Sequence, residues 1–129
     1  MNIFVYGTLM KGCYNHSAVA NYVEEIHEAK TEGKLYAVGS YPGLIEEKGE
    51  VMGELLEIKS DFSQKALEEL DGLEGCPNLF ERKQKQVTLL NSGEIKEAWV
   101  YVYNLNNYTE NKLIKSGSWK KFRETESYK

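Results

Sequence analysis

Histidine, cysteine and proline are scarce in this chain of 129 residues, which contains two of each. Neither His16 nor His27 has the spacing to cysteine or carboxylate residues that is typical of a metal site, so we expect no bound metal. The two cysteines, Cys13 and Cys76, are far apart in the sequence, and we interpret them as reduced thiols of a cytoplasmic protein.

The chain also lacks an excess of basic residues and a long apolar run. Its 16 Lys and Arg residues and 20 Asp and Glu residues give a net charge of −4, whereas proteins that follow phosphate backbones are usually basic. We therefore expect no nucleic-acid partner. The longest clear apolar run, residues 98–103, is too short to cross a membrane, so we expect no membrane partner. Residues 1–5 have no basic start, which favours a strand over a secretion signal.

Apolar residues are nevertheless sufficient for a packed interior, because 41% of the residues are hydrophobic and 12% are aromatic. A chain of this length fits one domain, which we expect to span residues 1–119. Residues 120–129 are polar, and we expect them to form a mobile tail.

Short apolar and alternating segments, rich in residues that favour strands, predict five strands at residues 2–6, 33–39, 51–58, 80–90 and 95–103. Tyr41-Pro42-Gly43 predicts a turn after the second strand, and residues 91–94 predict a hairpin turn between the last two. Gly53, inside the third strand, indicates a bulge or the close approach of another backbone.

Apolar residues at helical intervals predict one good helix over residues 61–74, with Asp61 and Gln64 at the spacing of a capping box. Gly75 is the expected left-handed stop of this helix, and Pro77 prevents its continuation.

A weaker helix, capped by Asn15 or Ser17, is expected to run through Val23. Strands dominate and sequence neighbours pair locally. This pattern predicts a small α+β domain with a mixed, curled sheet or barrel that the good helix closes or covers.

Glu74 is the first candidate for chemistry. Because an α-helix turns by about 100° per residue, Glu74 lies between Leu70 and Leu67, inside the apolar stripe of the predicted helix. Burial and the negative end of the helix dipole both raise the pKa of a carboxyl group there, and a raised pKa suits a general base near neutrality. The alternative is a helix that frays before Glu74 and leaves the side chain in water.

The second candidate is the 6–9 loop, which consists of Tyr6, Gly7, Thr8 and Leu9 and directly follows the first strand. Glycine lets the backbone turn sharply and brings a ligand close to successive N–H groups, an arrangement that suits a carboxylate or a developing oxyanion. The loop lacks the lysine and glycine spacing of a P-loop, so nucleotide binding is not supported. An ordinary turn at the end of a strand is the alternative.

Together, four segments resemble the γ-glutamylcyclotransferase-like family, most closely its short γ-glutamylamine cyclotransferase branch. They are Tyr6-Gly7-Thr8-Leu9, Leu70-Asp71-Gly72-Leu73-Glu74-Gly75, Phe80-Glu81-Arg82 and Ser116-Gly117-Ser118-Trp119. Further likeness to that branch comes from Asn15-His16 and from Cys76-Pro77 after Glu74-Gly75. One position departs from the family pattern, because members often have aspartate where Ser118 precedes the late tryptophan.

The resemblance implies a compact barrel of mixed strands with helices outside, flanking it. It also implies an enzyme that releases an amine or amino acid from a γ-glutamyl group, which cyclises to 5-oxoproline. The catalytic glutamate of the family falls on Glu74, and its substrate loop falls on the 6–9 loop. Tyr41 and Tyr103 are our further candidates for the pocket wall. The substrate's own α-amine is the nucleophile in this chemistry, so no cofactor is expected.

Two alternatives stay open, because a fold does not fix a function. One is a non-catalytic module that binds a small carboxylate in the same cavity. The other is a thiol enzyme in which Cys13 is the nucleophile and His16, three residues further on, assists it. The sequence leaves open which amine is released and whether the chain forms oligomers.

Overall fold

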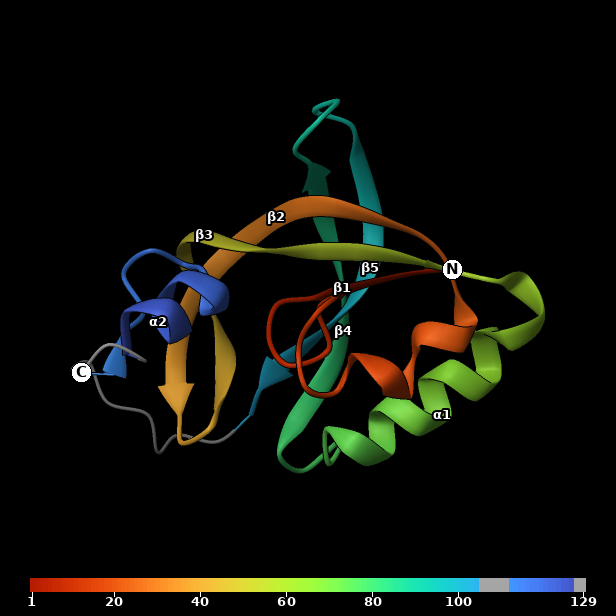
Figure 1. Cartoon of the computed structure of the whole chain (residues 1–129), viewed down its shortest axis with the longest axis horizontal. Coiled ribbons are helices and arrows are strands. Elements are labelled where there is room, and N and C mark those ends of the chain that lie inside the picture. The colour runs from red at the N-terminus through yellow and green to blue at the C-terminus, as the bar shows by residue number, and fades with distance from the viewer. Residues whose placement is uncertain (105–111, 127–129) are drawn as a thin grey trace.

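Five strands form a closed barrel in the computed structural model, which describes residues 1–104 and 112–126. Around the barrel the order is β1-β3-β2-β4-β5. Neighbouring strands are antiparallel, except that β5 pairs in parallel with β1 and also with β3 (Figure 1). The strands are β1 (Asn2–Val5), β2 (Val23–Val38), β3 (Tyr41–Ile58), β4 (Phe80–Leu89) and β5 (Ile95–Tyr103). The predicted mixed barrel of an α+β domain is confirmed.

Two of the strands are much longer than predicted. The predicted segments 33–39 and 51–58 are only parts of β2 and β3, which pair along most of their length. The first half of β2 escapes detection because much of it faces water and its sequence is rich in charged residues.

The turn predicted at Tyr41-Pro42-Gly43 is wrong. These residues begin β3, where Pro42 lies opposite Ala37 of β2. The chain reverses two residues earlier, at Gly39, whose φ of 69° is the left-handed conformation that glycine adopts without strain.

β1 runs against β3 and β5, and its residues Ile3 and Phe4 are at most 1% exposed. A Cβ atom on Gly53 of β3 would lie 2.3 Å from the carbonyl oxygen of Val5 and 2.8 Å from the Phe4 ring. Glycine at this position therefore lets β1 sit close to β3, and the predicted close backbone approach at Gly53 is confirmed.

The helices lie outside the barrel (Figure 1). The good helix, α1 (Ser63–Leu73), follows a 3₁₀ turn at Ser60–Phe62, and no side chain caps its start. The capping box expected of Asp61 is thus not formed, because the 3₁₀ turn places the helix start two residues later. Gly75 has a φ of 61° and ends the helix as predicted.

The expected short helix before Val23 is instead two 3₁₀ turns, His16–Ala18 and Ala20–Tyr22. Within the described residues, no helix has the length and apolar character needed to cross a membrane.

The segment expected to be a polar tail is largely a second helix, α2 (Trp119–Glu126). Trp119 is 3% exposed and its ring stacks on that of Phe122, so one apolar edge docks a sequence that is otherwise polar. Residues 127–129 of the expected tail lie outside the described residues.

A half-buried ion pair joins α1 to the barrel. Arg82 of β4 donates from Nε to Asp71 Oδ1 at 2.9 Å and from Nη2 to Asp71 Oδ2 at 3.2 Å. The hydroxyl of Tyr101, the residue opposite Arg82 on β5, donates to the same Oδ1 at 2.7 Å. The Arg82 guanidinium also lies 4.4 Å from the centre of the Trp99 ring. These contacts fix the last turn of α1 against two strands.

We expect Arg82→Gln to lower the free energy of unfolding by about 1–3 kcal/mol, because the half-buried Asp71 carboxylate loses its charged partner. Lys30→Gln, which breaks a more exposed ion pair with Glu50, should change it by less than about 0.5 kcal/mol. Urea unfolding of both variants and the wild type measures the difference. Equal effects of the two substitutions would contradict this role of the Asp71–Arg82 pair.

Candidate functional site

A cleft of about 980 Å³ opens beside β1, between the end of α1 and the start of α2. Its lining includes the residues just after β1, Leu73 and Glu74 at the end of α1, and Trp119 at the start of α2. Most site residues predicted from the sequence line this cleft, namely Tyr6, Gly7, Thr8, Leu9, Tyr41 and Glu74.

Glu74 follows the last residue of α1, and its backbone N–H still donates to the carbonyl of Leu70 at 2.9 Å. The helix is therefore intact up to this residue, and the half-buried side chain faces the cleft. Burial raises the pKa of the Glu74 carboxyl to about 7. No hydrogen bond or ion pair between described residues involves this carboxylate, so it is available to a ligand.

The 6–9 loop forms the floor of the cleft. Its backbone is tied by bonds from Met10 N–H to the Gly7 carbonyl at 3.1 Å and from Asn15 N–H to the Thr8 carbonyl at 2.8 Å. Among the described residues, no acceptor receives the N–H groups of Gly7, Thr8 and Leu9. These donors are thus free for an anion, as expected for a loop that binds a carboxylate or an oxyanion.

The side chains of Thr8 and Asn15 and the lack of a side chain at Gly7 shape the 6–9 loop. The Thr8 hydroxyl accepts from Asn15 Nδ2 at 3.0 Å, which leaves its own proton available to a ligand. A Cβ atom on Gly7 would lie 2.8 Å from the Pro42 ring, so glycine is the residue that fits beside this proline.

The Tyr6 hydroxyl has structural partners. It donates to the Tyr101 carbonyl at 2.6 Å and accepts from the Leu44 N–H at 3.1 Å, and so links β5 to β3 behind the cleft. Burial raises the pKa of this hydroxyl, and the charge of Glu74 raises it further. The Tyr101 hydroxyl, whose pKa is raised mainly by burial, is occupied by Asp71. The two tyrosines therefore contribute surface to the cleft while their protons are held by the protein.

The rings of Tyr41 and Tyr103 both pack near that of Phe80, with ring centres 6.0 and 5.4 Å from its own. Tyr41 lines the cleft, but Tyr103 does not; it is 5% exposed and lies against Gly43. Tyr101 lies two residues earlier on the same face of β5, and it is the tyrosine of this strand that lines the cleft.

Sequence reasoning missed the contribution of α2 to the cleft. Lys120, Arg123 and Glu124 line it from this helix, and Lys11 lines it from the segment after the 6–9 loop. The charged residues that follow Trp119 were the available signal, but the expectation of a mobile tail left them out of the predicted site.

Cys13 lines the cleft, but its surroundings do not favour a thiolate. Burial raises the pKa of the Cys13 thiol, although the charges of Lys120 and Arg123 oppose this effect. The His16 ring bonds through Nδ1 to the Leu9 carbonyl at 2.8 Å, and no side-chain hydrogen bond between described residues joins it to the thiol. The pairing that a thiol enzyme needs is therefore not formed here.

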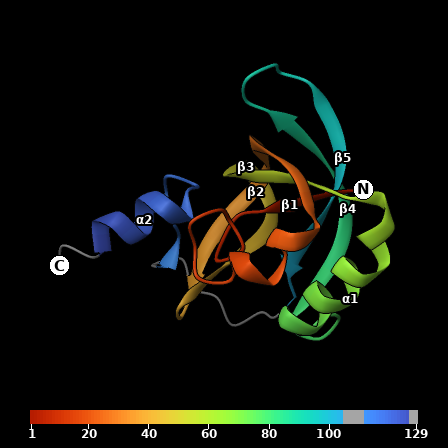
Figure 2. The ribbon, with the colours of Figure 1, turned by 45° about the vertical axis from the view of Figure 1, so that its right-hand side comes forward.

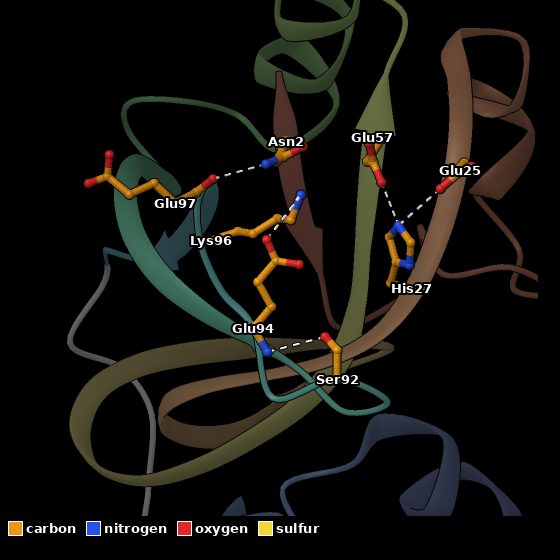
Figure 3. A network of polar contacts seen from close by, with 8 residues as sticks. All are labelled: Asn2, Glu25, His27, Glu57, Ser92, Glu94, Lys96 and Glu97. Carbon is orange, nitrogen blue, oxygen red and sulfur yellow. Dashed lines mark hydrogen bonds and ion pairs between the residues drawn. The ribbon is translucent and has the colours of Figure 1, made fainter.

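Away from the cleft, Glu25, His27 and Glu57 bring one potential metal-ligand atom each to within 4.8 Å of one another (Figure 3). His27 Nε2 lies 2.5 Å from Glu57 Oε2 and 3.4 Å from Glu25 Oε2. The hydrogen bond from His27 lowers the pKa of Glu57. This cluster could not be predicted from sequence spacing, because Glu57 comes from β3 and the other two residues from β2.

Glu74→Gln should stabilise the protein relative to the wild type at pH 8, but not at pH 5. A carboxyl group whose pKa is about 7 when folded and 4.5 otherwise binds more protons in the folded state, so stability falls as the pH rises between these values. This loss in the free energy of unfolding is roughly 3 kcal/mol at most. It is absent from Glu74→Gln, because an amide does not titrate. Urea unfolding of both proteins at the two pH values tests this. The same difference at both would mean that Glu74 is solvated.

A family model and related proteins match most of this chain. The family model described as gamma-glutamyl cyclotransferase, AIG2-like, matches residues 3–121. A gamma-L-glutamyl-butirosin B gamma-glutamyl cyclotransferase of Niallia circulans is 36% identical over 125 residues, which cover 95% of this chain and 77% of that protein. Gamma-glutamylaminecyclotransferase A of Danio rerio is 34% identical over 113 residues, which cover 78% and 68% of the two chains.

Solved structures share the fold. The crystal structure of YkqA from Bacillus subtilis matches with a TM-score of 0.76 at 29% identity, covering 99% of this chain and 42% of the longer YkqA chain. The crystal structure of an AIG2-like protein from Mus musculus matches with a TM-score of 0.66 at 27% identity, covering 86% of this chain and 80% of that one. The chain thus belongs to the AIG2-like gamma-glutamyl cyclotransferase family.

Proposed function

We propose that this protein is a γ-glutamyl cyclotransferase that releases 5-oxoproline and a free amine from a γ-glutamyl amine or amino acid, with Glu74 as the general acid and base. The observation that carries this proposal is the Glu74 carboxyl group, which lines the cleft without a protein partner and has a pKa of about 7. Such a group exchanges protons readily at neutral pH.

The reaction proceeds within the substrate. The α-amine nitrogen attacks the γ-carbonyl carbon, a five-membered lactam forms, and the bond from this carbon to the leaving nitrogen breaks. The α-ammonium loses two protons, and the leaving nitrogen gains two to depart as an ammonium ion. Glu74 takes a proton before the attack and returns one to the leaving nitrogen. No enzyme nucleophile, metal or cofactor takes part in this scheme.

The 6–9 loop provides the second requirement, a substrate held in a folded conformation. The free N–H groups of Gly7, Thr8 and Leu9 hold either the substrate carboxylate or the oxyanion that develops on the γ-carbonyl. Holding both reacting atoms close together can supply about 7–11 kcal/mol of the barrier reduction in the best cases. Because the loop is tied to Asn15 and Met10, its donors are fixed before the substrate arrives.

The proposal also names a partner, and the cysteines bear on the location of the protein. The partner is a small γ-glutamyl compound, and residues Tyr6, Thr8 and Tyr41 contribute to the walls that surround it. Cys13 and Cys76 are unpaired in the structure, in keeping with the cytoplasmic location expected from the sequence, which stays a prediction.

Glu74→Gln keeps the shape of the side chain but removes the proton acceptor, so turnover should fall by about 10²–10⁴-fold. The measurement is 5-oxoproline released from a panel of γ-glutamyl amines and γ-glutamyl amino acids, quantified by mass spectrometry. Glu68→Gln, an identical change at an exposed position of α1, is the control and should retain wild-type turnover. Wild-type turnover in Glu74→Gln would remove Glu74 from the mechanism. Calorimetric binding of γ-glutamyl compounds without any product would favour the non-catalytic binding module.

The pH profile gives a separate test. Glu74 must be ionised to accept a proton, so kcat/KM should rise with unit slope on the acidic side and level off near pH 7. If kcat/KM instead levelled off near pH 4.5, the carboxyl group of Glu74 would be solvated. The assay uses one accepted substrate across pH 4 to 8, with a stability check at each pH.

A further inference from the structure

We propose that Lys120 and Arg123 of α2 form an anion-binding subsite for the leaving amine, so that the enzyme prefers γ-glutamyl compounds whose leaving amine carries a carboxylate. This inference rests on the function proposed above and concerns the far end of the same substrate. It assigns a role to the helix that the sequence had suggested was a mobile tail.

The arrangement of the two helices sets where the substrate extends. In both views, the loop that follows β1 lies between α1 on one side and α2 on the other (Figures 1 and 2). Glu74 stands at the end of α1, and Lys120 and Arg123 stand on α2, yet all three line one cleft. A substrate whose reacting atoms lie near Glu74 and the 6–9 loop therefore has α2 on its other side.

The charged groups of the cleft favour this orientation. Besides Glu74, the charged lining residues among those described are Lys11, Lys120, Arg123 and Glu124. The amino-acid end of the γ-glutamyl group is served by Glu74 and by the free N–H groups of the 6–9 loop. The cations on the α2 side are left for the rest of the substrate, which is the leaving group.

These cations stand on a fixed support. Trp119 anchors the first turn of α2 at 3% exposure, and the Gly117 carbonyl just before it accepts from the Met52 N–H of β3 at 2.8 Å. Lys120 Nζ lies 3.3 Å from Oε2 of Glu54, which is 7% exposed and whose Oε1 accepts from the Lys11 N–H at 2.7 Å. The same carboxylate therefore holds α2 and the segment after the 6–9 loop together.

Apart from Glu74, the described cations of the cleft outnumber the described carboxylates beside them by one. Lys11, Lys120 and Arg123 stand against the carboxylates of Glu54 and Glu124. The Arg123 guanidinium lies over the Trp119 ring at 5.7 Å, which orients it without neutralising it. Both Lys120 and Arg123 line the cleft, and their charges lower the pKa of the Cys13 thiol, which lines it too. The planar guanidinium matches a carboxylate with two parallel hydrogen bonds.

Arg123 also lies beyond residues 3–121, the part of the chain that matches the family model. Lys120 lies within that range, and the match to the family model assigns no role to either residue. The proposed subsite also disfavours binding of a leaving amine with several positive charges, because Lys120 and Arg123 repel such a group.

The test compares γ-glutamylglycine with γ-glutamylglycinamide, which have nearly the same shape and differ in one negative charge. For the wild type, kcat/KM for 5-oxoproline release should be about tenfold higher with the acid. In the double variant Lys120→Gln, Arg123→Gln, the value for the acid should fall about tenfold while that for the amide changes less than twofold. Raising the salt concentration should lower the wild-type value for the acid alone, because salt screens the subsite.

Lys121→Gln is the matched control, since Lys121 is exposed on the same helix and does not line the cleft. It should leave both substrates unaffected. Arg123→Gln alone replaces the double variant if loss of the Lys120–Glu54 contact impairs folding.

Several outcomes would overturn the inference while the proposed function stands. They are equal wild-type rates with the two compounds, and a variant that slows both compounds equally, which would assign the cations to the glutamyl end. Turnover of uncharged γ-glutamyl amines, with none of γ-glutamyl amino acids, would also overturn the inference. If no γ-glutamyl compound yields 5-oxoproline, the proposed function is wrong and the inference falls with it.

Discussion

The position of Glu74 depends on the ion pair between Asp71 and Arg82. Asp71 lies three residues before Glu74, nearly one turn earlier along the helix, so whatever holds Asp71 also sets the direction of Glu74. Arg82 and the Tyr101 hydroxyl hold it from two adjacent strands. The barrel can thus place a carboxylate in a partly dry cleft without giving that carboxylate a charged partner of its own, which would lower its pKa. The structural charge pair and the free carboxyl group are kept separate.

The cleft combines fixed and free groups in a consistent way. The hydroxyl groups of Tyr6 and Tyr101 are bound to the protein, whereas the N–H groups of the 6–9 loop and the Glu74 carboxylate are not. Groups with structural partners define the shape, and the unpartnered groups are those that proton transfer and anion binding require. This division supports cyclisation within the substrate, a reaction that needs positioning more than it needs a reactive side chain.

Much of this could be predicted from the sequence. All five strands, α1, its stop at Gly75 and the lining position of Glu74 follow from local periodicity and glycine chemistry. The errors share one cause, which is that pairing across the barrel is not visible locally. The polar half of β2 is a strand because β3 lies beside it, and Pro42 belongs to β3 because Ala37 lies opposite. Likewise, α2 docks through Trp119 although its sequence is mostly charged.

Glu54 has a consequence for how the cleft responds to its contents. One of its oxygens binds the chain beyond β1, and the other contacts the helix on the opposite wall, so a single carboxylate on a barrel strand couples both walls. A ligand that binds Lys120 therefore competes with Glu54 for the same ammonium group, while the Lys11 N–H stays the other partner of that carboxylate. Both contacts meet on one strand of the barrel, so Glu54 is the residue that the two walls of the cleft share.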